Sequence, residues 1–371
     1  MVQPNLKVMS IFGTRPEAIK MAPVVKELEQ QSDVTSVVVV TAQHREMLDQ
    51  VLEIFAIEPD YDLDVMTANQ SLSVLTSRVL VALDDILLKE KPDVVLVHGD
   101  TTTSFVASLA AFYHGIKIGH VEAGLRTWDI TAPFPEEANR QMTDVLADYY
   151  FAPTALSKAN LLQSNVPEHK IYVTGNTVVD AIKQTTMTGF HHPIKEVLKE
   201  DTRKVLVTMH RRENFGQPMT DVFQTMVELV DMYPDLEFIY PVHPNPNVKR
   251  LAEEMLGQTE RIHLIAPLDV VEFHNLMRES YFMMSDSGGV QEEAPSVHRP
   301  VLILREVTER PEGLESGILS LVGTDPVKIK SYVSRLLDDE EYYQRICRSD
   351  NPYGDGRASE YIVNALKSTN K

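Results

Sequence analysis

The sequence predicts an α/β protein made of two doubly wound, Rossmann-like domains, each built on a parallel sheet. Short apolar runs alternate along the chain with amphipathic segments of helical length. The runs are rich in Val and Ile and apolar on both faces, which is typical of buried parallel strands. The chain has 371 residues, more than one hydrophobic core usually serves, and the alternation falls into two blocks.

Ten apolar runs predict the strands, five in each half of the chain. In the first half the expected strands are Lys7–Phe12, Val37–Thr41, Val94–Val97, Ile116–Val121 and Tyr149–Ala152. In the second half they are Val205–Thr208, Glu237–Pro241, Ile262–Ile265, Tyr281–Met284 and Val301–Leu304. Helical periodicity fills the gaps between them, for example over Ala22–Gln31 and Thr220–Met232.

A domain boundary is expected near residues 170–200. There a strand-like run, Ile171–Thr174, is followed by the segment GNTVVDAI and then by a polar, proline-containing stretch. Near the C-terminus the turn Tyr353–Gly356 sets off one last helix, which we expect to pack back on the first domain. The sequence thus predicts a first domain of residues 1–175 plus 355–371 and a second of 176–354.

Composition limits the classes of function. The chain is 43% apolar and 24% charged, as in a soluble globular protein, and its net charge of −19 argues against binding nucleic acid or an anionic membrane. The single cysteine, Cys347, excludes an internal disulfide framework and a cysteine-based zinc site. Neither a signal peptide nor a membrane-spanning apolar stretch is evident, so a cytoplasmic location is expected.

The most informative segment is SDSGGVQEEAP, residues 285–295. Gly288 and Gly289 let the backbone approach a ligand closely, and Ser287 precedes a helix start, where the dipole favours an anion. Glu293, one turn further on, suits the two hydroxyls of a ribose. Phosphate and ribose contacts from one segment indicate a nucleotide-linked substrate, although an ordinary strand–turn–helix corner is the alternative.

The first strand runs into another candidate anion site, GTRPEAIK. Thr14 and Glu17 have the spacing of a capping box, Arg15 stands at the mouth of the helix, and Lys20 lies about one turn inside it. A solvated helix start is the alternative. The dinucleotide fingerprint GxGxxG follows none of the strands, so no nicotinamide cofactor is expected.

Acidic residues follow the third and fourth strands of the first half. Asp100 ends the segment HGD, Glu122 lies in GHVEAGLRT, and Glu136 closes the long loop after it. Because ligands bind at the carboxyl ends of parallel strands, we expect these carboxylates to converge, with burial raising the pKa of at least one. Helix capping by Asp100 and structural ion pairs with Arg126 and Arg140 are the alternatives.

Basic side chains dominate the corresponding loops of the second half. His210 and Arg211 follow one strand and His243 the next, while Arg310 follows the last. Two histidines at neighbouring strand ends suggest a metal, but further ligands at metal spacing are missing, so a diphosphate is the favoured partner. The loop before Phe273 is positioned to hold a base.

Ten segments taken together resemble the non-hydrolysing UDP-N-acetylglucosamine 2-epimerases of bacteria. They are GTRPEAIK, TAQHREMLDQ, VLVHGDTTTS, GHVEAGLRT, FPEEANR, TGNTVVDA, HRREN, SDSGGVQEEAP, TERPEG and NPYGDG, in the family's order and over nearly the whole chain. The resemblance implies a glycosyltransferase-B-like fold with the active site in a cleft between the two domains. It implies a cofactor-free isomerase that interconverts UDP-GlcNAc and UDP-ManNAc for cell-surface polysaccharides, by eliminating UDP to 2-acetamidoglucal and adding it back.

The resemblance also assigns roles to residues. The catalytic positions fall on Asp100, Glu122, Glu136 and His210, without deciding which carboxylate removes the C2 proton and which returns it. The substrate-binding positions fall on Arg15, Lys20, Leu268, Phe273, Ser287, Gly288, Gly289, Glu293 and Arg310. Within this set, Glu293 would bind the ribose, Phe273 and the backbone near Leu268 the uracil, and the others phosphates.

Some bacterial members bind a second UDP-GlcNAc as an activator, and Gln43, Arg211 and His243 match positions of that site. Glu46 and Asn69 depart from the glutamine and arginine that some regulated members carry. A homodimer is the family expectation. Competing functions are a UDP-sugar glycosyltransferase of the same fold, a hydrolysing relative that releases ManNAc and UDP, and a non-catalytic nucleotide-sugar sensor.

Overall fold

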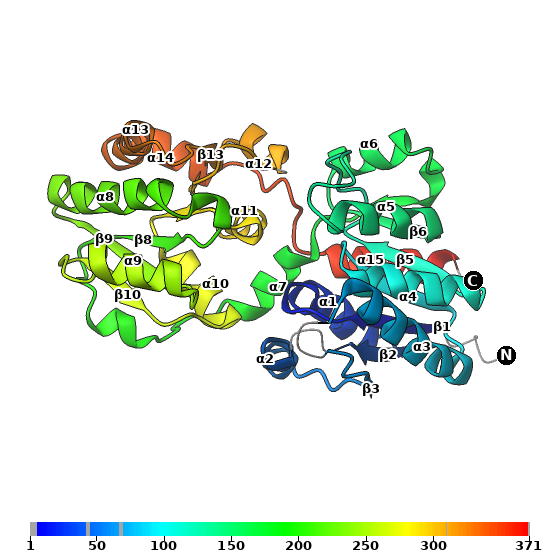
Figure 1. The fold of residues 1–371 in the computed structure, drawn as a ribbon. Coiled ribbons are helices and arrows are strands. Elements are labelled where there is room, and N and C mark those ends of the chain that lie inside the picture. Colours follow the sequence, from blue (N-terminus) through cyan, green and yellow to red (C-terminus); the bar gives the residue numbers. More distant parts are fainter. Residues whose placement is uncertain (1–5, 42–44, 67–69, 309, 370–371) are drawn as a thin grey trace. The chain divides into compact units, whose positions relative to one another are not determined.

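The computed structural model describes residues 6–41, 45–66, 70–308 and 310–369. Its internal contacts divide the chain into two compact units (Figure 1). Unit 1 comprises Met1–Lys183 and Tyr353–Lys371, and unit 2 comprises Gln184–Pro352. Each unit is an α/β structure around its own parallel sheet, so the predicted fold class is confirmed.

Unit 1 contains a seven-stranded parallel sheet of order β3-β2-β1-β4-β5-β6-β7. Its strands are β1 (Leu6–Phe12), β2 (Val34–Val40), β3 (Tyr61–Asp62), β4 (Val94–His98), β5 (Lys117–Val121), β6 (Tyr149–Ala152) and β7 (Ile171–Val173). Its helices are α1 (Arg15–Glu29), α2 (Arg45–Ile54), α3 (Leu72–Glu90), α4 (Thr102–Tyr113), α5 (Glu136–Leu146), α6 (Ala155–Gln163), α7 (Thr177–Thr185) and α15 (Ala358–Thr369), with a 3-10 turn at Glu168–Lys170.

Unit 2 contains a six-stranded parallel sheet of order β10-β9-β8-β11-β12-β13. Its strands are β8 (Arg203–Thr208), β9 (Leu236–Pro241), β10 (Ile262–Ile265), β11 (Phe282–Ser285), β12 (Val301–Ile303) and β13 (Leu319–Leu321). Its helices are α8 (Gln217–Met232), α9 (Pro246–Leu256), α10 (Val270–Glu279), α11 (Gly288–Glu293), α12 (Pro311–Glu315), α13 (Pro326–Asp338) and α14 (Glu340–Cys347). Three 3-10 turns lie at Pro193–Glu196, Arg212–Asn214 and Ala294–Val297.

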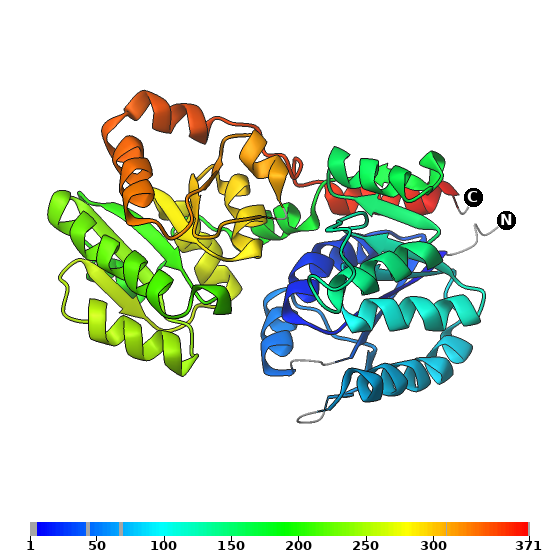
Figure 2. The ribbon, with the colours of Figure 1, turned by 45° about the horizontal axis from the view of Figure 1, so that its top comes forward.

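The strands form where the apolar runs predict them, because both faces of each sheet are covered. Every residue of β4 and of β11 is buried. In unit 1, α3 and α4 pack side by side over one face of the sheet (Figure 2) and share a core with β1, β2 and β4. The two strands that the patterns do not predict, β3 and β13, are two and three residues long.

The chain returns to unit 1 at its C-terminal end, where α15 packs on α1. Asp180 of α7 accepts hydrogen bonds from the backbone N–H groups of Ala358 and Ser359, at 3.1 and 2.9 Å, and so caps α15. These contacts join α7 to unit 1, which runs to Lys183. The boundary expected between residues 175 and 176 would instead place α7 in the second domain. Among the described residues, no helix is long and apolar enough to span a bilayer.

Candidate active site

In unit 1 the candidate side chains Arg15, Asp100 and Glu122 follow the carboxyl ends of β1, β4 and β5, which are neighbours in the sheet. Glu17 ties the first two ends together from a buried position. Its carboxylate accepts from the backbone of Gly13 and Thr14, at 3.1 and 2.7 Å, and from the hydroxyls of Thr101 and Ser104, at 2.7 and 2.9 Å. The start of α1, including the predicted capping box, is therefore fixed against the start of α4.

Arg15 and Lys20, both predicted to hold phosphates, are placed differently. Arg15 is the first residue of α1, and its side chain makes no hydrogen bond or ion pair within the described part of the chain. Lys20 instead forms a short ion pair with Glu122, and both side chains are largely buried. The structure thus leaves Arg15 available at the helix mouth and engages Lys20 with a carboxylate.

Glu122 lies directly after β5 in a left-handed backbone conformation, with φ of 65°. Besides Lys20, its Oε2 accepts from Asn176 Nδ2 at 3.0 Å and lies 3.7 Å from His98 Nε2. Burial acts to raise the pKa of this carboxyl, but the charges of Lys20 and His98 outweigh burial and bring the pKa well below its usual range. Glu122 is therefore not a carboxyl whose pKa burial raises, because Lys20 and His98 lie against it.

Asp100 follows β4 and is held by two residues of α5. Arg140 Nη2 forms an ion pair with its carboxylate, and Asn139 Nδ2 donates to its backbone oxygen at 3.0 Å. Arg140 also binds Glu137, with Nη1 at 3.1 Å from Oε2. Of the structural ion pairs considered from the sequence, the one between Arg140 and Asp100 is present. Asp100 does not cap α4, because Thr101 does so.

Glu136 and Glu137, adjacent at the start of α5, have different environments. Glu137 is completely buried and accepts from the backbone N–H groups of Thr127 and Trp128, both at 3.1 Å, which fixes the loop between β5 and α5. Glu136 is only partly buried, and its side chain has no hydrogen-bond or ion-pair partner among the residues described. Of this pair, Glu136 is thus the carboxylate available to a ligand.

In unit 2 a fully buried carboxylate, Asp286, organises the loop after β8. It accepts from the backbone N–H groups of His210 and Arg211, at 3.0 and 2.8 Å, and from Asn214 Nδ2 at 3.0 Å. The His210 ring stacks on His243, with centroids 5.2 Å apart. Burial lowers the pKa of His210, although Asp286, 3.6 Å from Nδ1, opposes the shift, so the neutral ring is favoured.

Two guanidinium groups converge on the start of α11. A Cβ built on Gly288 would lie 3.5 Å from Arg211 Nη2 and 3.5 Å from Arg310 Cζ, so a side chain at this position would crowd the space between them. Arg310 also pairs with the buried carboxylate of Glu292, at 2.7 Å. This site therefore combines a helix start, a close approach to the backbone and two cations.

The remaining predicted ligand positions lie at the starts of α10 and α11. Ser287 immediately precedes α11, and a Cβ on Gly289 would lie 3.4 Å from Glu293 Oε1. Phe273 is half-buried on α10, and Leu268 lies just before the capping box that starts this helix. All these positions follow the carboxyl ends of β10 and β11.

A family model described as UDP-N-acetylglucosamine 2-epimerase matches residues 26–367. The chain belongs to the UDP-N-acetylglucosamine 2-epimerase family. The UDP-N-acetylglucosamine 2-epimerase of Bacillus subtilis (strain 168) is 53% identical over 362 residues, which cover 98% of this chain and 95% of that protein. The enzyme of the same name from Escherichia coli (strain K12) is 48% identical, with 98% and 99% covered. This chain is thus an epimerase, an isomerase.

Solved structures show the same fold. The UDP-GlcNAc 2-epimerase from Neisseria meningitidis, bound to UDP-GlcNAc, is similar with a TM-score of 0.89 and 47% identity, covering 98% of this chain and 100% of that one. The glycotransferase of kitacinnamycin has a TM-score of 0.66 at 13% identity. The second likeness shows the fold alone, which confirms the glycosyltransferase-B-like architecture of the epimerase.

Three residues of this epimerase that touch the site are missed by sequence reasoning. His98, a buried histidine at the end of β4, approaches Glu122, and Asn176 donates to the same oxygen. Asp286 accepts a hydrogen bond from the backbone N–H of His210 and so holds the loop that contains it. The first two stand in the segments VLVHGDTTTS and TGNTVVDA, at the end of β4 and shortly after β7, so a polar residue near the carboxyl end of a strand was the available signal.

A separate buried network surrounds Arg126 in the epimerase. Arg126 pairs with Asp144, whose other oxygen lies 2.6 Å from His120 Nδ1. His120 Nε2 in turn lies 2.7 Å from the backbone oxygen of Gly99. Arg126 therefore does not pair with Asp100, Glu122 or Glu136, as one alternative from the sequence supposed.

The predicted activator positions are only partly described. Gln43 and Asn69 lie outside the described residues, as does the side chain of Glu46. Arg211 and His243 lie beside Gly288 and His210 respectively. Within the described residues, no group of three or more His, Cys, Asp or Glu side chains is arranged to hold a metal ion.

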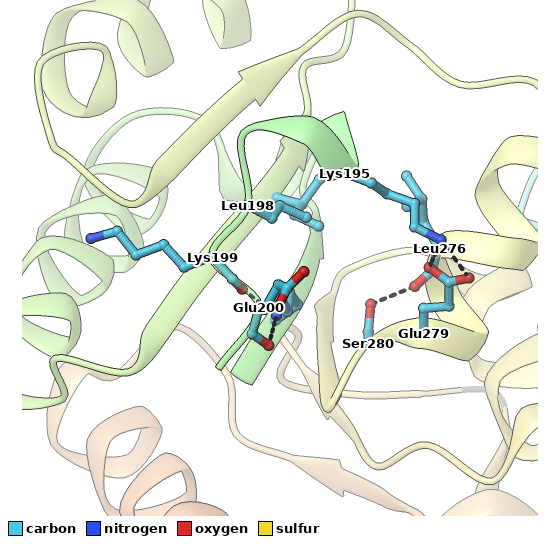
Figure 3. A pocket seen from close by; sticks show the side chains of 9 residues that line it. Lys195, Leu198, Lys199, Glu200, Leu276, Glu279 and Ser280 are labelled. Atoms are coloured by element: carbon cyan, nitrogen blue, oxygen red, sulfur yellow. Dashed lines mark hydrogen bonds and ion pairs between the residues drawn. The ribbon is translucent and has the colours of Figure 1, made fainter. Parts of the chain in front are cut away.

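A cavity of about 330 Å³ lies elsewhere in unit 2, near the amino ends of β8 and β11 (Figure 3). Two of its lysines are engaged by the protein. Lys195 pairs with Glu279 at 3.0 Å, and Lys204 donates to the backbone oxygens of Lys199, Glu200 and Thr202. The cavity is remote from the carboxyl strand ends that carry the site, so it is not part of it.

Proposed function

We propose that the chain interconverts UDP-GlcNAc and UDP-ManNAc by inverting the configuration at C2. The observation that carries this proposal is the acidic edge of unit 1, where Glu122, Asp100 and Glu136 occupy three different charge environments. Acid–base chemistry at a carbon needs such differentiated groups, since one must accept a proton and another must supply one.

The reaction balances without a redox cofactor. A base removes the proton at C2, the C1–C2 double bond of 2-acetamidoglucal forms, and the C1–O bond breaks with its electron pair on the β-phosphate of UDP. In the return step UDP adds back to C1, and a proton is delivered to the opposite face of C2. Stabilisation of the departing diphosphate is as important as the base, because the leaving group carries the developing charge.

The charge environments suggest how the work divides in unit 1. Glu122 has a pKa well below its usual range, since Lys20 and His98 outweigh burial, so it is ionised and can take up a proton, while the low pKa makes it a weaker base. We assign Lys20 to keeping Glu122 ionised rather than to binding a phosphate. Glu136 and Asp100 are the candidates for the proton transfer on the other face, and Arg15 is the phosphate ligand of this unit.

The other proposed contacts with UDP belong to unit 2. The guanidinium of Arg310 and the backbone at Gly288 meet the diphosphate, and the neutral ring of His210 supports the leaving phosphate. The other proposed contacts are Ser287 and Gly289 with phosphate, Glu293 with the ribose, and Phe273 and the backbone near Leu268 with the uracil.

Two finer proposals concern partners. A second UDP-GlcNAc would bind as an activator through Gln43, Arg211 and His243. A homodimer would cover the apolar side chains that α3, α4 and α5 expose, among them Val81 at 71% and Val145 at 83% exposed. Since the substrate is a charged nucleotide that does not cross membranes unaided, a cytoplasmic location suits the enzyme.

The test is incubation of the protein with UDP-GlcNAc and no acceptor. Formation of UDP-ManNAc is expected. Release of free ManNAc and UDP would instead indicate a hydrolysing enzyme. Turnover that requires an added acceptor would indicate a glycosyltransferase, and binding without turnover would indicate a sensor.

A further inference from the structure

Asn176, which lies between β7 and α7, contacts three separate parts of unit 1. Its backbone N–H donates to the oxygen of Tyr353 at 2.8 Å. Its side-chain Oδ1 accepts from the N–H of Val178 at 3.0 Å, at the start of α7. Its Nδ2 donates to Glu122 Oε2 at 3.0 Å. The residue is only 4% exposed, so these contacts are shielded from water.

The two oxygens of Glu122 are used unequally. Lys20 and Asn176 both donate to Oε2, and His98 Nε2 lies nearest to the same oxygen. Within the residues described, Oε1 receives no hydrogen bond. It lies on the side of Gly99, 3.7 Å from where a Cβ on that glycine would stand. A carboxylate held by one oxygen in this way offers the other to a ligand in a defined direction.

We propose that Asn176 is a positioning residue for the epimerisation, which holds Glu122 by Oε2 so that Oε1 faces the proton at C2. This inference rests on the proposed role of Glu122 as a base. In the step concerned, the C2–H bond breaks, its proton binds Oε1, and its electron pair forms the C1–C2 double bond as UDP leaves. Asn176 itself neither gains nor loses a proton and forms no covalent bond. It acts only by orienting the carboxylate of Glu122.

The position of Asn176 also connects Glu122 to the point where the chain changes units. The chain leaves unit 1 after Lys183 and re-enters it at Tyr353, whose oxygen Asn176 binds. The packing there is close, because a Cβ on Gly175 would lie 2.9 Å from the Tyr353 oxygen. The residue that orients the base is therefore anchored to the returning segment.

Two substitutions of Asn176 distinguish a role in orienting Glu122 from a role that is only structural. Asn176→Ala removes the donor to Glu122 and the cap of α7. Asn176→Asp has the same shape and keeps the cap, since Asp and Asn are equally good at this position, but it turns an acceptor towards Glu122 Oε2. If Asn176 only filled space, the aspartate variant would be the milder one. The proposal requires the reverse, with kcat reduced about tenfold by alanine and about a hundredfold by aspartate.

A pH series sharpens the test. Beside ionised Glu122, the introduced carboxyl has a raised pKa, and below it the protonated form donates as the amide did. Lys20 and His98, which also face Glu122, act against this rise but stay in place in every variant. The kcat of Asn176→Asp relative to the parent should therefore recover as the pH falls from about 8 to about 6.

Asp180→Ala is the matched control. It breaks the two backbone contacts between α7 and the start of α15 but touches no part of Glu122. It should lower thermal stability and leave kcat and its pH dependence unchanged. UDP affinity, measured by calorimetry, should be the same in all three variants and the parent.

Two outcomes would overturn the proposal. One is an aspartate variant as active as the alanine variant or more so. The other is a loss of kcat in Asp180→Ala equal to that in the Asn176 variants. These outcomes are distinct from a failure of the proposed function, in which the parent protein itself would make no UDP-ManNAc.

Discussion

The three acidic side chains of unit 1 differ most at the scale of single residues. Glu122 is paired with Lys20 and lies beside His98, Asp100 is paired with Arg140, and Glu136 has no partner within the described residues. A carboxylate that is paired within the protein can stabilise the fold as well as take part in the reaction. An unpaired carboxylate does not stabilise the fold. Removing a paired charge should therefore lower both the free energy of unfolding and kcat, whereas removing an unpaired one should lower kcat alone.

Adjacent Glu136 and Glu137 test this directly. Glu136→Gln should reduce kcat about a hundredfold or more and leave the free energy of unfolding unchanged, because its carboxylate holds nothing. Glu137→Gln should lower the free energy of unfolding by about 1–3 kcal/mol, because it removes the acceptor for Arg140 and for the loop at Thr127. Denaturant titration and initial rates provide both readouts. A stable, fully active Glu136→Gln variant would remove that residue from the mechanism.

Lys20 tests the charge state of Glu122. The pKa of Glu122 is lowered, so the ionised base is present above that pKa and is lost as the pH falls through it. Lys20→Met removes one cause of lowering and leaves burial, so the pKa rises. The acidic limb of kcat/KM should then move to higher pH, while Lys20→Arg, which keeps the charge, should leave it near the parent's. An unmoved limb in Lys20→Met would show that Glu122 is not the titrating base.

At this scale the sequence predicted the strand ends that Asp100 and Glu122 follow, but not how these residues pair. The positions of Asp100 and Glu122 followed from the rule that ligands bind at the carboxyl ends of parallel strands. The pairing of Lys20 with Glu122 joins residues 102 positions apart, and it depends on the order of β1, β4 and β5 in the sheet. Neither periodicity nor a local motif contains that information.

At the scale of elements, one buried carboxylate sets the geometry of a whole loop. Asp286 accepts three donors from the turn that carries His210 and Arg211. The sequence predicted the loop and its basic side chains, and it missed Asp286 as the anchor because an Asp after a strand is equally common as a cap or a turn residue.

Replacing Asp286 by Asn should weaken UDP binding about tenfold, equivalent to about 1.4 kcal/mol, because an amide cannot accept from all three donors and the loop shifts. Asp325→Asn is the control, since Asp325 also accepts from a backbone N–H, that of Val327 at 2.9 Å, but only caps α13. Calorimetric titration with UDP compares them. Equal affinities in both variants would mean that the His210 loop does not depend on Asp286.

The strands that the sequence did not predict have no continuous apolar run. The ten predicted strands are present, with ends that differ by up to three residues, whereas β3 is Tyr-Asp and β13 is Leu-Ser-Leu. These two strands join the sheets at their edges, next to β2 and β12, so sheet pairing rather than local sequence determines them.

At the scale of the whole molecule, the exposed apolar side chains of unit 1 support the proposed dimer. Val81 and Leu88 of α3 stand two turns apart on one face, and Phe112 and Tyr113 at the end of α4 are also exposed. Val81→Glu should convert the proposed dimer into monomers, because it buries a charge in an apolar interface. Val327→Glu, at a valine 76% exposed in unit 2, should not. Light scattering distinguishes the outcomes, and a monomeric parent protein would contradict the proposed dimer.

The central claim is that the C2 proton leaves the sugar and another returns. In deuterated water, the protein should convert UDP-GlcNAc into UDP-ManNAc that carries deuterium at C2, and recovered UDP-GlcNAc should acquire it as the reaction approaches equilibrium. Glu122→Gln should slow this incorporation about a hundredfold or more. Nuclear magnetic resonance of the sugar gives the position of the label. UDP-ManNAc that retains its original hydrogen at C2 would contradict the mechanism.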